Sequence, residues 1–188
     1  MKHVLAIAIF LFSLQSFAQK PCEYTTDVTD SIGTYKSTKE YMIAEKNFAG
    51  TSSYIFFSLA VADGMPLLNV QLIQKSKGFM KANCFDKNSK LFLQLNNGKV
   101  VTLIHTDKEN CGTMLRDDKG FDNRLTPGTF MFMKDSFEEL KKSPVSMMRI
   151  KYLTDTEDYV LKKQFTSELN NEVYEPETYF MQNIDCAK

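Results

Sequence analysis

The feature that most constrains the fold is the dipeptide Asn97-Gly98, which lies between two runs rich in β-forming residues, 91–95 and 100–105. Asn-Gly between two such runs is the strongest short-range signal for a β-hairpin, because both central residues of a two-residue type I′ turn need positive φ. A two-residue turn at these positions pairs residue 96 with residue 99 and sets the register of the whole hairpin. The sequence therefore predicts a hairpin over residues 91–105.

Cross-strand partners in an antiparallel pair share one face of the sheet. In this register one face is strongly apolar and belongs to the core. The opposite face is also partly apolar, so we expect the hairpin to lie inside a sheet covered on both sides. The residues expected on the core face are Leu91, Leu93, Leu95, Val100, Thr102 and Ile104. Those expected on the opposite face are Phe92, Gln94, Val101, Leu103 and His105.

Turn residues separate further strand-like runs along most of the chain. Residues 38–46 and 53–62, with Ala49-Gly50 between them, predict a second hairpin. The dipeptide Asp63-Gly64 precedes the alternating residues 68–73, which predict another strand. The remaining strand-like runs are residues 129–133, 147–153 and 159–165.

Two short helices complete the predicted elements. Ser136 and Glu139 have the spacing of a capping box, and Pro144 prevents the helix from continuing. Pro176 suits the first position of a closing helix, while residues 107–127 are expected to form a polar loop. The predicted fold class is mainly β (α+β), an antiparallel β-sandwich or a partly closed barrel with one or two short helices.

The N-terminal segment has the pattern of an export signal. Lys2 precedes the apolar run 4–14, and the small residues Ser16 and Ala18 occupy the positions expected before a cleavage site. The sequence predicts a signal peptide over 1–18, cleavage after Ala18 and one β-rich domain over 19–188, secreted or periplasmic. This layout resembles that of uncharacterised exported β-rich proteins of Bacteroidota-type bacteria, a resemblance that brings no functional motif.

Charge and hydropathy exclude two classes of partner. The chain has 23 Lys and Arg against 23 Asp and Glu, so it lacks the basic excess that nucleic-acid binding requires. Its apolar runs are shorter than the about 20 residues that cross a bilayer. We expect no nucleic acid as a partner and no membrane span.

The four cysteines favour structural disulfides. Four cysteines allow three pairings, and the sequence alone does not choose among them. Extending the hairpin register outward would place Cys84 opposite Cys111, which would leave Cys22 to pair with Cys186. The chain has no Cys-X-X-Cys motif, and the wide spacings fit neither a redox pair nor a zinc site.

Other chemistry-bearing residues have structural interpretations that we prefer. His105 is the only histidine of residues 19–188 and lacks a nucleophile motif, so we expect a partly exposed residue at a strand end. The acidic residues of loop 107–123 could hold calcium or act as a glycosidase pair, but their spacing favours a solvated loop. Four methionines could bind copper through their thioether groups, but core packing is the better interpretation. These residues are Met131, Met133, Met147 and Met148.

These observations name no catalytic, cofactor-binding or metal-binding residue, so we expect a protein that is not an enzyme and needs no cofactor. The favoured function is a non-catalytic binding or interaction domain of the cell envelope or periplasm, with a protein or envelope component as partner. The 15 Phe and 8 Tyr leave an alternative open, a lipocalin-like carrier with a cavity for an apolar ligand. An envelope hydrolase is the third hypothesis.

Overall fold

The computed structural model describes residues 21–188, so the predicted signal peptide and its cleavage site lie outside the described residues. Most of the described chain forms an antiparallel β-sheet. The strands of this sheet are β1 (Tyr24–Thr29), β2 (Thr34–Thr38), β3 (Tyr41–Phe48), β4 (Thr51–Ala62), β5 (Met65–Ser76), β6 (Lys90–Leu95), β7 (Val100–His105), β8 (Thr113–Arg116), β9 (Asp122–Phe132), β10 (Val145–Lys151) and β11 (Thr156–Val160). A separate small hairpin pairs β12 (Phe165–Thr166) with β13 (Val173–Tyr174).

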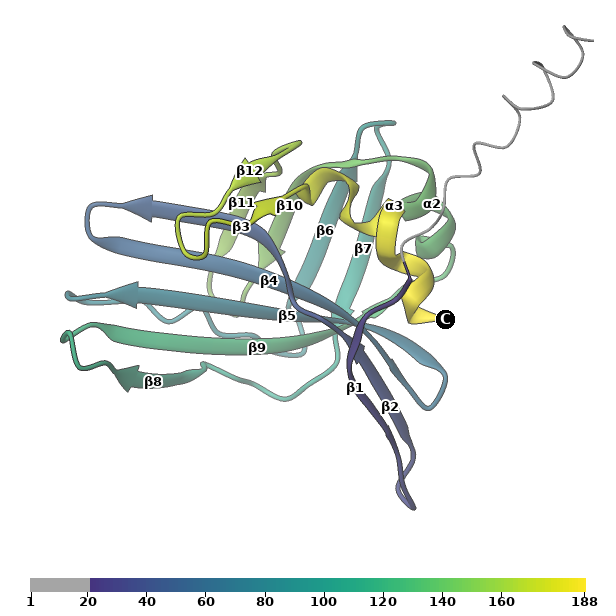
Figure 1. The fold of residues 1–188 in the computed structure, drawn as a ribbon, viewed down its shortest axis with the longest axis horizontal. Helices are drawn as coiled ribbons and strands as arrows, with labels where there is room; N and C mark the ends of the chain where they lie inside the picture. Colours follow the sequence, from purple (N-terminus) through teal and green to yellow (C-terminus); the bar gives the residue numbers. More distant parts are fainter. Residues whose placement is uncertain (1–20) are drawn as a thin grey trace, which may run out of the picture.

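The sheet folds over on itself along the long strand β9. Its order is β1-β2-β4-β5-β9-β7-β6-β10-β11, with β3 added to β4 and β8 added to β9. The first half of β9 pairs with β8 and the second half pairs with β7, so the strands beyond β9 turn away from the direction of β4 and β5 (Figure 1). The sheet ends at β1 and β11 and does not close into a barrel.

One large hydrophobic core lies on the inner face of this folded sheet. Short helices cover it at one end, beside the C-terminus (Figure 1). They are α2 (Ser136–Lys142), α3 (Tyr179–Asn183) and the 3₁₀ turns η1 (Pro176–Thr178) and η2 (Ile184–Ala187). Phe180 of α3 packs against Phe57 of β4 and Phe132 of β9, with ring centroids 5.9 and 6.4 Å apart. The closing helical segment therefore joins the two halves of the sheet.

A glycine allows close aromatic packing in this core. Gly128 of β9 points to the inner face, where the ring of Phe85 lies directly against it. A Cβ atom at this position would lie 2.7 Å from Cδ2 of Phe85, which is too close for any real contact. Phe85 and Phe130 are both fully buried here, so the inner face is filled by aromatic side chains.

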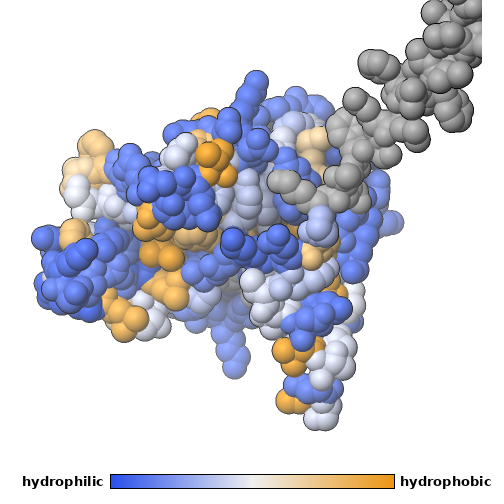
Figure 2. All heavy atoms as spheres, in the orientation of Figure 1, coloured by the Kyte–Doolittle hydropathy of each residue, from blue (hydrophilic) through white to orange (hydrophobic). Residues whose placement is uncertain are grey.

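The hairpin of β1 and β2, which we call the arm, projects away from the rest of the molecule (Figure 1). Only residues 35–37 of the arm pair with β4, opposite residues 60–62. Its outer part exposes apolar side chains, with Ile32 91% and Val28 47% exposed, and Figure 2 shows hydrophobic patches on the projecting arm.

The structure confirms the predicted fold class and most of the turns. Residues 21–188 are mainly β with antiparallel pairing and short helices. Ala49-Gly50 and Asp63-Gly64 each have positive φ at both residues, as two-residue hairpin turns require. The closing helical segment begins at Pro176 as expected.

The hairpin of β6 and β7 forms, but its predicted register is wrong by one residue. The amide of Leu95 donates to the carbonyl of Lys99 (2.8 Å), which makes a three-residue loop in which Gly98 has φ 84° and Asn97 does not have positive φ. Leu93 therefore pairs with Val101, and Leu91 pairs with Leu103. A one-residue shift exchanges the faces of a strand, so the inner face receives Val101, Leu103 and His105 in place of Val100, Thr102 and Ile104.

Three further predictions need correction. Residues 107–127 are not only a loop, because they contain β8 and the first half of β9. The cap of α2 is Asp135, which has φ 65° and no side-chain cap bond, while Ser136 is the first helical residue. The strand predicted at 159–165 is β11 at Thr156–Val160. Within the described part of the chain, none of the helices has the length and apolar character to cross a membrane.

Candidate functional site

A groove of about 690 Å³ lies on the outer face of the sheet, across β4, β5 and β9. Side chains alternate between the two faces of a strand, so the residues between the core positions of these strands form its floor. The register places Ser58 of β4 opposite Asn69 of β5, and Asn69 opposite Thr129 of β9. Together with Ser37 of β2, these residues form what we call the polar row.

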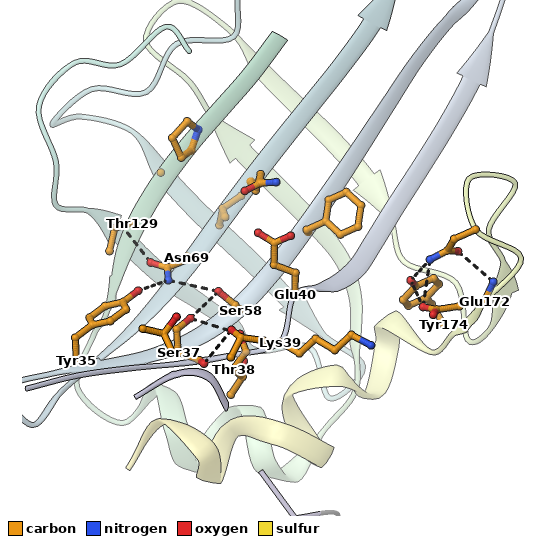
Figure 3. A pocket seen from close by; sticks show the side chains of 18 residues that line it. Tyr35, Ser37, Thr38, Lys39, Glu40, Ser58, Asn69, Thr129, Glu172 and Tyr174 are labelled. Carbon is orange, nitrogen blue, oxygen red and sulfur yellow. Dashed lines mark hydrogen bonds between the residues drawn. The ribbon is translucent and has the colours of Figure 1, made fainter. Parts of the chain in front are cut away.

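Hydrogen bonds connect the polar row across four strands (Figure 3). Ser37 Oγ donates to Ser58 Oγ (3.2 Å), and Asn69 Nδ2 also donates to Ser58 Oγ (3.4 Å). Thr129 Oγ1 donates to Asn69 Oδ1 (3.4 Å). The row crosses three gaps between neighbouring strands and so spans about 14 Å, given a strand spacing of about 4.8 Å. It presents hydroxyl and amide groups and carries no formal charge.

The arm forms one wall of the groove. Tyr35 of β2 reaches over β4, and its hydroxyl accepts a hydrogen bond from Asn69 Nδ2 (2.9 Å), as Figure 3 shows. At the corner between β2 and β3, the amide of Leu59 donates to Oγ1 of Thr38 (2.9 Å), which fixes the bend. Lys39 and Glu40 occupy this corner and line the rim of the groove.

The C-terminal segment forms the opposite wall. Asn170 Nδ2 donates to Tyr174 OH (2.8 Å), and this hydroxyl donates to Glu172 Oε2 (2.7 Å). Burial raises the pKa of Tyr174 above its usual value, so its hydroxyl stays protonated as a donor. The ring of Tyr174 also packs edge-on against Tyr41 of β3, with centroids 5.1 Å apart. The hydrogen bonds above hold the wall together, while this ring contact and the amide of Glu175, which donates to Tyr41 OH (2.6 Å), hold it to the sheet.

His105 is buried, which corrects the expectation of a partly exposed residue. It is 3% exposed, because the register of β7 turns residue 105 towards the core. Its ring stacks on Phe85 and meets Phe130 edge-on, with centroids 5.4 and 5.2 Å apart. Its Nδ1 donates to the main-chain oxygen of Asp86 (3.0 Å). Nε2 is buried without a hydrogen-bond partner among the described residues.

Asp86, Ser89 and His105 lie together but do not form a catalytic triad. In a triad the serine hydroxyl bonds to the histidine and the histidine bonds to the carboxylate. Here Ser89 Oγ donates to Asp86 Oδ1 (3.0 Å), and His105 contacts only the main chain of Asp86. Burial alone would raise the pKa of Asp86, but hydrogen bonds from Ser89 and Asn88 outweigh it and keep the pKa below its usual value. The cluster stabilises loop 86–89.

The cysteines form two disulfides within the described residues. Cys84 bonds to Cys111 and Cys22 bonds to Cys186, with Cα atoms 4.1 and 5.6 Å apart. The first bridge lies beside an isolated β-bridge between Phe85 and Asn110, so local antiparallel pairing brings the two cysteines together. Disulfides of this kind are typical of proteins in oxidising compartments.

The acidic loop does not form a metal site. Over residues 21–188, no group of three or more His, Cys, Asp and Glu side chains is placed to hold a metal ion. Asp117 accepts hydrogen bonds from the amides of Lys119 and Phe121 and pairs with Lys75 (2.9 Å). The hydrogen bond from Lys75 is the main cause of the strongly lowered pKa of Asp117. Of the four methionines expected to pack in the core, Met148 is fully buried and Met131 and Met147 are partly buried, but Met133 is 44% exposed, so the expectation is wrong for Met133.

Comparison with family models, with curated proteins and with solved structures found no match to this chain. The groove was not predicted from the sequence. One part of it, the pairing of β4 with β5, could have been inferred from the turn between these strands. The turn at Asp63-Gly64 sets the register that pairs Ser58 with Asn69. The contribution of β9 depends on long-range pairing, which no local pattern shows.

Proposed function

We propose that this chain is an exported, non-catalytic binding domain of the cell envelope or periplasm that holds its ligand in the outer groove. The observation that carries this proposal is the polar row, a continuous set of hydroxyl and amide groups lining a groove of about 690 Å³. Ligand sites are commonly concave and have a few placed polar groups, and their volumes are about 300–1,000 Å³. The two disulfides support function in an oxidising compartment.

The carrier and hydrolase alternatives have less support. A lipocalin-like carrier needs space inside the sheet, whereas Phe57, Phe85 and Phe130 fill inner-face positions and are fully buried. A hydrolase needs a nucleophile and a base in hydrogen-bond contact at an accessible surface. Ser89 and His105 are buried and are not bonded to each other through their side chains.

Export and cleavage are tested on the protein recovered from a Gram-negative host that expresses the full chain. N-terminal sequencing should give a mature protein that begins at Gln19, and thiol alkylation before and after reduction should show that all four cysteines are paired. A full-length protein in the cytosol with reactive thiols would contradict the proposed location.

Binding in the groove is tested with isotope-labelled residues 19–188 and a fixed panel of probes, namely neutral oligosaccharides, anionic oligosaccharides and extended peptides. At least one class should shift the amide signals of Asn69 and Thr129 in the NMR spectrum. The substitution Thr129→Arg should abolish the shifts by filling the groove. The matched control Val160→Arg places the same charge on β11, where residue 160 is 80% exposed, and should leave binding unchanged. If no probe shifts the groove signals, or if Thr129→Arg binds normally, the proposal is wrong.

A further inference from the structure

The groove floor combines two neighbouring rows of different character. Beside the polar row, Phe56 of β4 pairs with Gln71 of β5, and Gln71 pairs with Pro127 of β9. These residues form a second row across β4, β5 and β9. Two residues along a strand separate the rows by about 6.7 Å. Phe56 and Pro127 present ring and methylene carbon, while the polar row presents hydroxyl and amide groups. The floor is therefore apolar on one side and polar on the other.

Free hydrogen-bonding capacity is concentrated at the junction of these rows. The side-chain amide of Gln71 makes no hydrogen bond to another of residues 21–188, although it is half-buried in the groove between Phe56 and Pro127. An amide offers two donor hydrogens and an acceptor oxygen. Ser37 Oγ and Thr129 Oγ1 donate their hydrogens and keep lone pairs as acceptors, whereas Ser58 Oγ accepts two hydrogen bonds and keeps its own hydrogen as a donor. The floor can both donate to a ligand and accept from it.

The main chain of the floor is not accessible for strand addition. Strand β5 is paired with β4 and β9 along the whole floor. On the far side of β9, residues 126–129 have no strand partner, but the carbonyls of Pro127 and Thr129 already accept hydrogen bonds from Asn110 Nδ2 (3.1 Å) and the amide of Thr106 (2.9 Å). A peptide that binds by strand addition needs an unpaired edge whose amides and carbonyls face the ligand. Recognition in the groove must therefore come from side chains.

Charges at the rim disfavour an anionic ligand. Glu40 and Glu172 line the groove together with a single cation, Lys39, and the floor itself is neutral. Like charges at a binding surface weaken association, most of all at low ionic strength. A neutral ligand does not meet this repulsion.

We propose that the outer groove binds a neutral saccharide; this inference rests on the proposed binding function. A sugar ring has hydroxyl groups that both donate and accept hydrogen bonds, and it has a face of C–H groups that can pack on an aromatic ring. The polar row and Gln71 match the hydroxyl groups, and Phe56 and Tyr35 offer ring surface beside them. The groove is long enough for more than one sugar ring.

The test measures binding of neutral oligosaccharides, one anionic oligosaccharide and one extended peptide to residues 19–188 by calorimetry, with NMR to locate the site. A neutral oligosaccharide should bind, shift the amide signals of Asn69 and Gln71, and keep its affinity when salt is raised. Gln71→Ala should weaken binding about five- to tenfold, which corresponds to the loss of one hydrogen bond. The matched control Gln94→Ala changes an exposed glutamine of β6 outside the groove and should bind normally.

The outcomes separate this inference from the function on which it rests. If only the anionic or the peptide probe binds in the groove, the binding function stands and the saccharide inference is overturned. If no probe shifts the groove signals, both are overturned. If a neutral saccharide binds but Gln71→Ala and Gln94→Ala have equal affinities, the assignment of the saccharide to this groove is wrong.

Discussion

At the scale of single residues, His105 shows how burial controls protonation. Burial lowers the pKa of His105 below its usual value of 6.5, while the hydrogen bond to Asp86 and the charges of Asp107 and Asp86 oppose this effect only in part. The unfolded chain therefore takes up a proton near pH 6.5, and the folded chain does so only at lower pH. Between these two pKa values the unfolded state binds more protons, so the free energy of unfolding must fall as the pH falls.

We predict that the free energy of unfolding of residues 19–188 decreases below about pH 6.5 by up to about 1.4 kcal/mol per pH unit from this one proton. The variant His105→Gln keeps a donor for the Asp86 carbonyl and removes the titrating group. Urea unfolding at pH 7.5, 6.5 and 5.5 measures the difference. The variant should be less stable at pH 7.5 but should lose less stability between pH 6.5 and 5.5. Parallel pH profiles for the two proteins would show that His105 is not the source.

At the scale of elements, the β6–β7 hairpin shows which parts of the fold could be predicted. The Asn-Gly dipeptide correctly predicted a hairpin, but the register is set by which side chains are buried in the core. The three-residue loop buries Val101 and Leu103 with the leucines of β6, whereas a two-residue turn would have buried Thr102 and exposed Leu103. Elements without an apolar pattern were missed for a related reason. The arm and β8 are mostly exposed, so their sequences carry no core-facing alternation.

Loop geometry can be tested with two alanine substitutions. In the observed loop only Gly98 has positive φ, so Gly98→Ala should destabilise the protein by about 1–2 kcal/mol. Asn97→Ala should cost about 0.5 kcal/mol, because it removes only an exposed hydrogen bond to the amide of Lys99. In a two-residue type I′ turn both substitutions would meet the same backbone strain. Equal destabilisation in urea unfolding would therefore support the register that the structure rejects.

At the scale of the whole molecule, the candidate site depends on parts that are distant in sequence. Its floor comes from β4, β5 and β9, one wall comes from the arm and the other from residues 170–174. Sequence periodicity predicted several of these strands, but the pairing of β5 with β9 joins residues that are 46 to 64 positions apart in the sequence and has no local signature. The groove therefore cannot be recognised without knowledge of how β5 and β9 pair.

The two disulfides should stabilise the molecule unequally. The Cys22–Cys186 bridge closes a separation of 164 residues and the Cys84–Cys111 bridge closes 27. In the chain-entropy model these loops correspond to about 5.2 and about 3.6 kcal/mol. The double variant Cys22→Ser/Cys186→Ser should thus be less stable than Cys84→Ser/Cys111→Ser, as measured by urea unfolding. It should also increase hydrogen exchange in β1, because Tyr24 donates to the main-chain oxygen of Cys186 (3.0 Å). The reverse order of stabilities would contradict the entropic account.

The bridge between Cys22 and Cys186 also makes nearly the entire described chain a covalent ring. A single cut by a protease in an exposed turn, such as the one at Ala49-Gly50, opens this ring but leaves both fragments attached to each other. The nicked protein then stays one molecule under non-reducing conditions and separates only after reduction. The same geometry makes the described domain suited to circular permutation, because Cys22 and Cys186 already lie side by side and new ends can be placed in a surface turn.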